Sequence, residues 1–480
     1  MTKRRGTGLL LALLAFAQFI SAIDYNIVYV ALPEIGRAVG FDARSLQWVV
    51  SAYAVAFGGF LLLGGRMADL LGRRRMFATA LALYGLASLA GGLATGPGLL
   101  VAARAVQGIG GALLLPATLS LINTSFDEGA ERNRALAVWG GAGAVGLALG
   151  SLLGGVLTNY LGWEAVFYVN VPLALGAAAV AWKTITPDAP RERGRGFDIT
   201  GALSATVGFT ALVFGVVQGP EMGWFSVQVL ATLLAGLALI GVFLAVEART
   251  AHPLMPLRLL RNRNLVAAMG VTFIFMGTFG AQYYFFTLYL QTVHQYSAMA
   301  TGLAFLPSAL TGMAGTKVSE KLLGRVGTRT TLVTGLVLGA AGMAVLALAL
   351  SPAGHYPALL PGIVLLGLGQ GLAWTAMFAA AGTGVDAHHQ GIASAMASTT
   401  QQIGSAVGLA VLIAVASHGT HAIAGPSLVP GLRTAGFTAA ALTLLGVAIA
   451  LTLRREGTAR PAAGSDEDVD TRTTHPALSP

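Results

Sequence analysis

The sequence contains no cysteine and few charged residues. Without cysteine, disulfide bonds and thiolate metal sites are excluded. Asp, Glu, Lys and Arg together make up 10% of the 480 residues, whereas a soluble protein usually carries about a quarter. Hydrophobic residues make up 55%, and the mean hydropathy is +0.72. This composition excludes a soluble domain with a single anchor and predicts an all-α polytopic membrane protein.

Acidic side chains are almost absent from the long apolar runs. The first run, Leu9 to Leu32, contains one, Asp24, and no other predicted span has an acidic residue in its interior. At roughly 1.5 Å per residue this run crosses a hydrocarbon layer of about 30 Å. A charge at that depth is costly and usually marks a functional site. We therefore expect Asp24 to couple an ion.

The basic start, Lys3 to Arg5, followed by an apolar run also has the form of a signal peptide, with Ile20-Ser21-Ala22 as a cleavage site. The run continues to Leu32, beyond the short apolar region of a signal peptide. We expect a retained first helix.

Apolar windows of about 20 residues, separated by charged or turn-rich breaks, predict about fourteen transmembrane helices. The windows are 9–32, 46–65, 76–95, 98–122, 134–158, 164–183, 198–219, 225–246, 265–290, 299–319, 329–350, 357–380, 390–416 and 434–453.

The basic residues test this topology. Arg104 lies inside a span, and Arg37, Arg44 and Arg433 fall on the side opposite the N-terminus. The rest of the 29 Lys and Arg residues fall on the N-terminal side. Cytoplasmic loops carry such an excess, so we expect both termini in the cytoplasm. The bias also explains the net charge of +9, so this charge does not indicate nucleic-acid binding.

The chain repeats itself faintly. The segment Asp69 to Arg73 (DLLGR) resembles Lys321 to Arg325 (KLLGR), and a Gln-Gly pair occurs in the fourth and twelfth spans. Parallel halves of a transporter give such a repeat. The expected domains are an N-terminal six-helix half (1–186), a linker with an extra helix pair (187–250), a C-terminal six-helix half (251–455) and a disordered cytoplasmic tail (456–480).

A glycine-rich basic motif, Gly65 to Arg75, follows the second span. It resembles the loop between helices two and three of the major facilitator superfamily. By that resemblance Gly65, Asp69, Gly72 and Arg73 form a conformational latch. Asp69 and Arg73 are four residues apart and can pair on a helix. A plain positive-inside cluster is the alternative.

Other motifs extend the resemblance over about residues 8 to 455. Arg104 to Gly111 resembles the helix-four motif of proton-coupled members. Gly146 to Gly155 resembles the helix-five antiporter motif, with Ser151 in place of the usual proline. Three further segments resemble the fourteen-helix drug:proton antiporters, namely Asn170-Val171-Pro172, Phe197 to Gly201 and Leu303 to Pro307. The first helix, Ile23 to Pro33, also resembles theirs, with Asn26 replacing a small hydroxyl residue.

This resemblance implies a major facilitator fold with two six-helix halves and two extra helices. It implies proton-coupled export of lipophilic or cationic drugs by alternating access, in a bacterial cytoplasmic membrane. Export of one specific metabolite, antibiotic or lipid is the alternative. The expected partners are a lipophilic small molecule, protons and membrane lipids, and we expect a monomer without nucleic-acid binding.

Asp24 and Arg104 are expected to meet. Asp24 lies nine residues from Pro33, or about 13 Å, and Arg104 lies six residues from the start of its helix, or about 9 Å. They therefore sit at similar depth, and the resemblance places their helices beside one central cavity. An interaction would neutralise two costly charges and let Asp24 bind and release a proton. A static structural ion pair is the alternative.

Aligning the halves places Gln282 opposite Asp24, so the C-terminal half offers amides and aromatic rings instead of an acid. Such groups suit an apolar ligand held by stacking and a few hydrogen bonds. The substrate-binding candidates are Tyr29, Tyr53, Gln107, Gln282, Tyr283, Tyr284, Phe286, Gln370, Trp374 and Gln401, with Gln402 beside them.

Gly146, Gly150 and Gly154 recur every four residues and, with Gly155, are expected to form a close-packing face. A role in setting the transport direction is the second reading of the same motif.

A membrane enzyme would need clustered His, Asp or Glu residues, and the spans offer Asp24 and Arg104 alone. We therefore expect no enzyme, no cofactor other than the coupling proton and no metal. A non-transporting receptor stays open. His388-His389 is expected to be a solvated pair.

Overall fold

The computed structural model describes residues 2–42, 45–127, 130–186, 199–250, 255–386, 390–417 and 425–454. Within these ranges every regular element is helical. The first group is α1 (Thr2–Val39), α2 (Trp48–Leu71), α3 (Arg73–Gly92), α4 (Pro97–Ser125), α5 (Ala130–Leu161), α6 (Ala165–Tyr168) and α7 (Asn170–Thr184). Next come α8 (Ile199–Met222) and α9 (Val227–Glu247). The last group is α10 (Arg263–Phe275), α11 (Ala281–Leu288), α12 (Ala298–Ala304), α13 (Leu306–Ala349), α14 (Tyr356–Gly382), α15 (Gln390–Ser417) and α16 (Val429–Ala450).

Short elements lie between these helices. The segments Ser45–Gln47, Leu257–Arg261 and Pro426–Leu428 are 3-10 helices. Two π-helical turns, Met276–Gly280 and Tyr289–Val293, flank α11 and continue its path.

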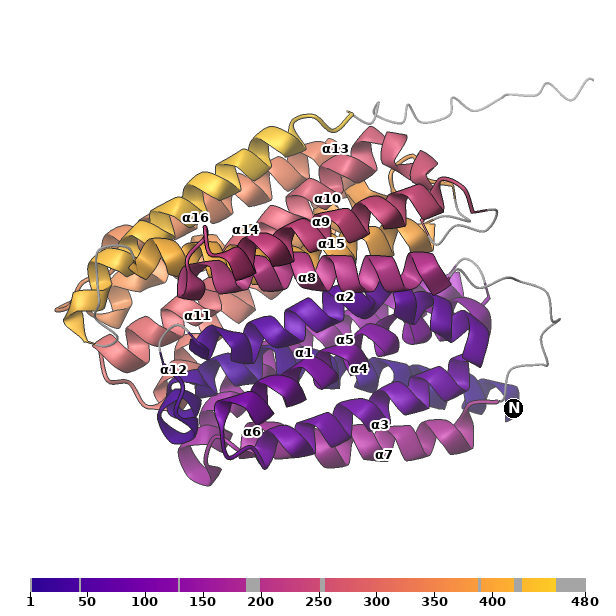
Figure 1. The fold of residues 1–480 in the computed structure, drawn as a ribbon, viewed down its shortest axis with the longest axis horizontal. Coiled ribbons are helices and arrows are strands. Elements are labelled where there is room, and N and C mark those ends of the chain that lie inside the picture. Colours follow the sequence, from indigo (N-terminus) through magenta and orange to yellow (C-terminus); the bar gives the residue numbers. More distant parts are fainter. Residues whose placement is uncertain are drawn as a thin grey trace, which may run out of the picture.

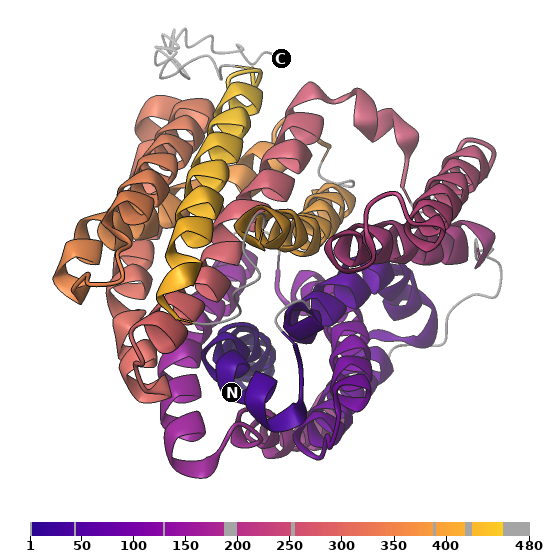
Figure 2. The same cartoon turned by 60° about the vertical axis from the view of Figure 1, so that its left-hand side comes forward.

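The long helices run side by side along the molecule (Figure 1). Helices α1–α7 pack on one another and form what we call the N-terminal group, and α10–α16 form the C-terminal group. The α8–α9 pair lies at the edge of the molecule, where α8 contacts both α2 and α15 (Figure 2). Helix α1 begins and α16 ends at the same end of the bundle (Figure 1).

Eleven helices among the described residues are long and apolar enough to cross a membrane. Two expected spans, 299–319 and 329–350, correspond to a single stretch, Ala298–Ala349, whose helix is broken at Gly327 (φ 81°, ψ 168°). The expected spans 46–65 and 76–95 overlap α2 and α3, which are not among these eleven; the apolar stretch described at α2 is Ser45–Leu61. The count of fourteen therefore stays a prediction. The tail 456–480 and the linker residues 187–196 lie outside the described residues.

Two glycines with positive φ interrupt the helices at the repeated loop. Gly72 separates α2 from α3 with φ 89° and ψ 140°, a conformation that favours glycine. In the second copy of the repeat the break occurs at Gly327, three residues beyond the corresponding Gly324. The backbone turn therefore recurs, but not at the same position of the motif.

Helix α5 packs closely on α1 through one row of glycines. A Cβ atom on Gly146 would lie 2.8 Å from the carbonyl oxygen of Phe19, and on Gly150 it would lie 2.6 Å from that of Ile23. At Gly154 the distance to the carbonyl oxygen of Ile27 is also 2.6 Å. These distances leave no room for a side chain, so the row sets the separation of the two backbones.

The two groups meet at the end of the bundle that lies opposite the N-terminus. There α5 packs on α12, with Gly155 against Ala298 and Gly302 against Ser151. The amide of Gln291 donates to the carbonyl of Val30 across the same boundary, at 2.8 Å. Toward the other end, Gly140 and Gly141 of α5 are exposed, and a Cβ atom added to either would meet no heavy atom within 4 Å. The close seam between the two groups that α5 and α12 form thus lies at the end opposite the N-terminus.

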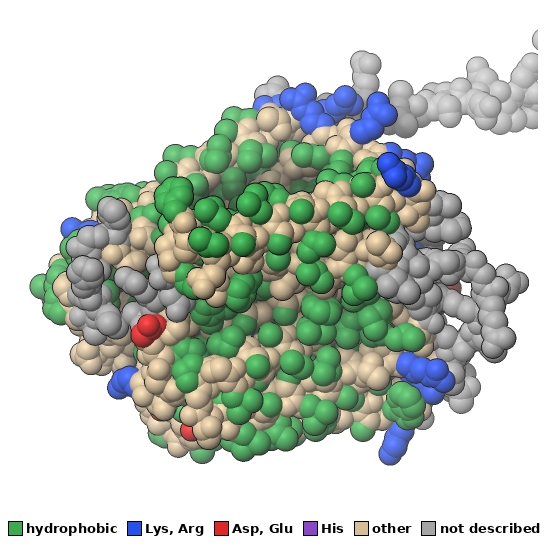
Figure 3. Space-filling model, viewed as in Figure 1, with side chains coloured by type: hydrophobic (Ala, Val, Ile, Leu, Met, Phe, Trp, Pro, Cys, Tyr) green, Lys and Arg blue, Asp and Glu red, His purple; other side chains and the backbone are tan. Residues whose placement is uncertain are grey.

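The two ends of the bundle differ in their content of basic side chains. In Figure 3, Lys and Arg side chains gather mainly at the end where the N-terminus lies, and the long sides of the molecule are covered by hydrophobic and uncharged groups. A belt without charges between two polar ends is the surface that a bilayer requires.

Candidate functional site

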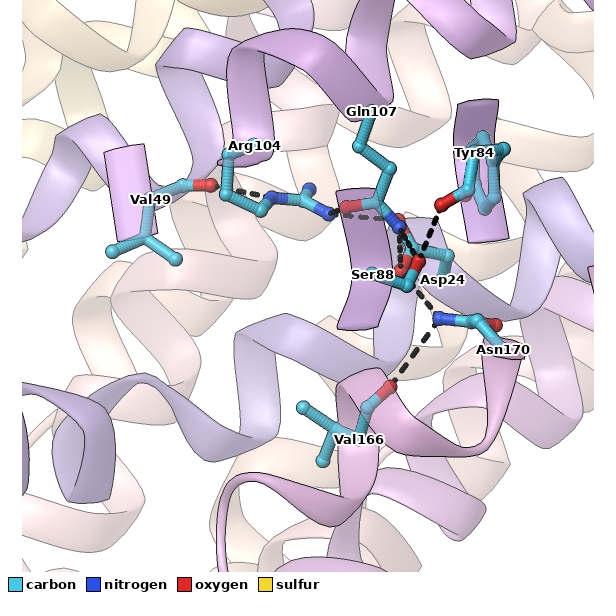
Figure 4. Close-up of polar contacts among 8 residues, drawn as sticks. All are labelled: Asp24, Val49, Tyr84, Ser88, Arg104, Gln107, Val166 and Asn170. Atoms are coloured by element: carbon cyan, nitrogen blue, oxygen red, sulfur yellow. Dashed lines mark hydrogen bonds and ion pairs between the residues drawn. The ribbon is translucent and has the colours of Figure 1, made fainter. Parts of the chain in front are cut away.

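Asp24 sits in the middle of α1 with no exposed surface. Its Oδ2 atom accepts from Nη1 of Arg104 at 2.8 Å. Its Oδ1 atom accepts from Nε2 of Gln107 at 2.9 Å and from Nδ2 of Asn170 at 2.8 Å. Arg104, Gln107 and Asn170, together with the hydroxyl of Tyr84, therefore surround a carboxylate that has no contact with solvent (Figure 4).

Arg104, on α4, is almost as deeply buried, at 2% exposed. Its Nε donates to the backbone carbonyl of Val49 on α2 at 2.8 Å. Its guanidinium also donates to Oε1 of Gln107, at 2.5 Å, and lies 4.6 Å from the ring centroid of Tyr53. A cation over an aromatic face gains further attraction in a desolvated setting. The guanidinium is thus held on two sides besides its contact with Asp24.

Gln107 connects the pair to α3. Its carbonyl oxygen accepts from Arg104, while its amide nitrogen donates both to Asp24 and to the hydroxyl of Ser88 at 2.8 Å. The sequence predicts Gln107 as a substrate-binding residue. In the structure its amide is buried and bonded to Asp24, Arg104 and Ser88. The hydroxyl of Tyr84 points toward Asp24 from the same helix, α3 (Figure 4).

Residues of five helices thus form one buried cluster, which we call the Asp24 site. It comprises Asp24 of α1, Tyr53 of α2, Tyr84 and Ser88 of α3, Arg104 and Gln107 of α4, and Asn170 of α7. Bringing both charges out of water costs several kcal/mol, and only good geometry and further hydrogen bonds offset that cost. The positive and negative charges balance, so the cluster is neutral while the carboxylate is ionised.

Three members of the Asp24 site are not identified by the sequence. Tyr84 and Ser88 lie inside the span expected over 76–95, and Asn170 stands out only as part of a family motif. A polar side chain in the interior of an apolar span is the available signal. Helices α3 and α7 contain such residues beside many small ones, and only the packing shows which of them face Asp24.

A second set of candidates meets where the two groups of helices adjoin. The ring of Tyr29 lies 5.9 Å from that of Tyr283, which in turn stacks on Phe305 at 5.3 Å. Gln370 of α14 faces the hydroxyl of Tyr283. The hydroxyl of Tyr25, next to Asp24 in the sequence, lies 3.4 Å from that of Ser405 on α15. Tyr25 and Tyr29 therefore face the opposite group, while Asp24 faces its own.

Other candidates lie apart from this set. Gln282 lines a small apolar pocket with residues of α13 and α16, including Met343 and Leu432. Trp374 packs on Phe275 and Phe378. Tyr284, Phe286, Gln401 and Gln402 are buried; Tyr284 packs on Phe285 and Phe286 on Phe305. Tyr53 belongs to the Asp24 site, as described above.

The expected latch is described only in part. Gly72 forms the turn between α2 and α3, and a Cβ atom added to Gly65 would lie 3.8 Å from Pro116 of α4. The side chain of Asp69 lies outside the described residues, so its pairing with Arg73 stays a prediction. His388 and His389 are likewise outside them. Among the described residues, no group of three or more His, Asp or Glu side chains is arranged to hold a metal ion.

The chain resembles several known proteins over most of its length. It is 38% identical to the cephamycin export protein CmcT of Amycolatopsis lactamdurans, covering 92% of this chain and 90% of that one. It is 39% identical to the puromycin resistance protein pur8 of Streptomyces alboniger, covering 87% and 83%. The multidrug resistance protein Stp of Mycobacterium tuberculosis is 34% identical, with 85% and 76% covered.

Solved structures share the fold. The nucleoside transporter NupG, in a mutant form, superposes with a TM-score of 0.65 at 13% identity, covering 93% of this chain and 99% of that one. The POT family transporter PepTSo gives 0.67 at 16% identity, covering 92% and 97%. The family model of the Major Facilitator Superfamily matches residues 14–409. With its helical architecture and its relatives, this match shows that the chain is a multi-pass membrane transporter that belongs to the Major Facilitator Superfamily.

Proposed function

We propose that this protein exports lipophilic or cationic drugs and other toxic small molecules from a bacterial cell, in exchange for protons. The observation that carries the proposal is the Asp24 site, a solvent-free carboxylate paired with Arg104 at 2.8 Å inside an apolar helix. Ionisable groups within a membrane span usually belong to substrate or proton pathways. The relatives named for antibiotic export and multidrug resistance support the choice of substrate class.

The proton cycle follows from the contacts of Asp24. In this conformer the carboxylate is paired with Arg104 and accepts from Gln107 and Asn170. When the opposite conformer admits water from outside, a proton binds to one carboxylate oxygen and the charge attraction to Arg104 is lost. Return to the present conformer restores the pair and drives the proton off toward the inside. The proton thus enters and leaves on opposite sides of the membrane.

The direction of opening rests on the charge distribution. We place the N-terminal end, where Lys and Arg gather, in the cytoplasm, following the positive-inside rule. The closed end, where α5 packs on α12, then faces outward. The described conformer is therefore the inward-facing one, which accepts substrate from the cytoplasm. The protein is proposed to act as a monomer in the cytoplasmic membrane, with both termini inside.

The rings of Tyr25, Tyr29, Tyr283 and Phe305 form the proposed substrate contact. They lie between the two groups, next to the Asp24 site along α1. Aromatic faces bind apolar bodies and attract cations, which fits lipophilic cationic drugs. Because the two groups part and rejoin during the cycle, a ligand held here is exposed to each side in turn.

A second candidate is the export of one specific antibiotic or metabolite, or of a lipid. The relatives with 38% and 39% identity are named for cephamycin and puromycin, whereas the multidrug relative Stp is 34% identical. A dedicated exporter uses the same scaffold and the same Asp24 site. The two candidates differ in breadth of substrate and not in coupling.

Reconstituted transport tests both. The purified protein is placed in proteoliposomes, a pH gradient is imposed, and uptake of puromycin, lincomycin, a cephamycin and a lipophilic cationic dye is measured. Transport of several unrelated compounds supports multidrug export, and transport of a single compound supports the dedicated exporter. Asp24→Asn is expected to abolish gradient-driven transport of either kind. Full gradient-driven transport by Asp24→Asn would refute the proton cycle, and binding without transport or counterflow would indicate a receptor.

A further inference from the structure

Asn170 is the third donor to the Asp24 carboxylate and has no role in the pairing of charges. It begins α7, directly after the short helix α6, and Pro172 follows two residues later. Its Nδ2 atom donates to Oδ1 of Asp24 at 2.8 Å and to the carbonyl of Val166 at 3.3 Å. The side chain is fully buried. In this conformer, two hydrogen bonds therefore orient the amide nitrogen toward the carboxylate.

The other atom of the same amide is free. Oδ1 of Asn170 is buried without a hydrogen-bond partner among the described residues. An unpaired buried acceptor is costly, and here it lies on the side chain that touches the proton-binding group. If the amide turns over, the oxygen faces Asp24 and can accept from a protonated carboxyl, at the loss of the hydrogen bond to the carbonyl of Val166. Asn170 can thus serve both protonation states, as donor to the ion and as acceptor from the acid.

We propose that Asn170 is a positioning residue that sets the pH at which Asp24 takes up and releases its proton. This inference rests on the proposed proton cycle. The two hydrogen bonds are unequal, because a bond to an ionised group is about twice as strong as one between neutral groups. Asn170 therefore favours the ionised carboxylate overall. It makes the proton leave more readily in the conformer described here.

Helix α5 packs on α1 at this level through Gly146 and Gly150. The titratable and charged groups that face Asp24 come from other helices. They are Tyr53 on α2, Tyr84 on α3 and Arg104 on α4, while α7 contributes only the uncharged Asn170. A change at Asn170 thus alters one neutral hydrogen-bonding group and leaves the charges in place. Any shift in proton binding is then due to that group.

The experiment is an infrared titration of the purified, full-length protein without substrate. The carboxyl C=O band that disappears in Asp24→Asn identifies the protonated form of Asp24, and its intensity is followed against pH. Asn170→Leu keeps the approximate volume and removes both amide atoms. Its midpoint is expected about one pH unit higher than in the parent, since the difference between the two bonds corresponds to roughly tenfold in proton affinity. Asn170→Ala, which leaves room for water, is expected to give a smaller shift in the same direction.

Asn26→Leu is the matched control. Asn26 is also a buried asparagine, whose Nδ2 donates to the backbone carbonyl of Leu147 at 2.9 Å and whose Oδ1 has no hydrogen-bond partner among the described residues. Among the described residues Asn26 makes no hydrogen bond to Asp24. The midpoint of the Asp24 band in Asn26→Leu is therefore expected to equal that of the parent. An unchanged midpoint in both Asn170 variants, or equal shifts in Asn26→Leu, would overturn the inference. Because the titration needs no substrate, its result is independent of whether the predicted drugs are transported.

Discussion

Asp24 and Arg104 are 80 residues apart in the sequence and 2.8 Å apart in the structure. Neither side chain has meaningful contact with solvent. Arg104 is also anchored to the backbone of α2, so the pair joins three helices, α1, α2 and α4. A change in the protonation of Asp24 therefore alters the contact between helices and not only a local charge. In the proposed cycle, this relationship links proton binding to conformation.

Removing one partner of the pair is expected to lower the free energy of unfolding more than removing both charges does. Arg104→Leu leaves an ionised carboxylate in an apolar interior and should lower the free energy of unfolding by roughly 3–5 kcal/mol. Adding Asp24→Asn to that variant removes the unpaired charge and should recover most of the loss. Thermal unfolding of the two single variants and the double variant in detergent measures this. Additive losses in the double variant would show that the two side chains are not energetically coupled.

The glycines of α5 allow a second comparison within one helix. Gly150→Ala places a methyl group 2.6 Å from the carbonyl oxygen of Ile23, so α1 and α5 must move apart. We expect a loss of roughly 1–3 kcal/mol in the free energy of unfolding, as for other overpacked sites. Gly141→Ala, on the same helix, meets nothing within 4 Å. That variant should be neutral or stabilised by up to about 1 kcal/mol, because alanine favours a helix. Similar behaviour of the two variants in thermal unfolding would refute the close-packing role of Gly150.

The pairing of Asp24 with Arg104 can be anticipated because the rise of a helix fixes depth. Two charges in the interiors of apolar spans, at similar depth, have few other partners. The hydrogen bond of Asn170 cannot be anticipated in the same way. An asparagine bonds to backbone, side chains or water with similar ease, and its partner depends on how α7 is rotated against α1. Gln107 is assigned to substrate binding from the sequence because a glutamine amide suits a substrate site as well as the Asp24 site.

The fold, too, can be predicted from the sequence only in part. Hydropathy marks where a span runs, so the membrane-protein class and most helix positions are predictable. It does not show how a helix ends. The loop expected between 319 and 329 is helical up to a single glycine, Gly327. Such a break depends on one backbone conformation and leaves no trace in an average over many residues.

The seam between α5 and α12 is expected to control which end of the bundle is open. A methyl group on Gly302 would lie 2.6 Å from the carbonyl oxygen of Ser151. Gly302→Ala should therefore disfavour the conformer that is closed at this end. Spin labels on cysteines introduced at Leu161 and Leu348, both exposed, report the separation of the two groups there. The parent chain has no cysteine to interfere. We expect a longer distance in Gly302→Ala.

Gly312→Ala is the control for that measurement, because its nearest neighbour, the carbonyl oxygen of Gly367, is 3.6 Å away and belongs to the same group. Its label distances should match those of the parent. An unchanged distance in Gly302→Ala would mean that the seam does not hold the end closed.

Two buried glutamines make a final contrast. Gln47, before α2, is fully buried, and neither atom of its amide has a hydrogen-bond partner in the part of the chain that the structure describes. Gln107 is equally buried, and both of its amide atoms are bonded. A buried polar group without a partner costs roughly 1–3 kcal/mol. Gln47→Leu should therefore raise the free energy of unfolding by about that amount, while Gln107→Leu should lower it.

Thermal unfolding in detergent distinguishes the two glutamines, and transport adds a second measurement. Gln107→Leu removes a donor to Asp24 and should weaken gradient-driven transport, whereas Gln47→Leu leaves the Asp24 site intact. If Gln47→Leu is destabilised as strongly as Gln107→Leu, the prediction that the unpartnered amide of Gln47 costs stability is wrong.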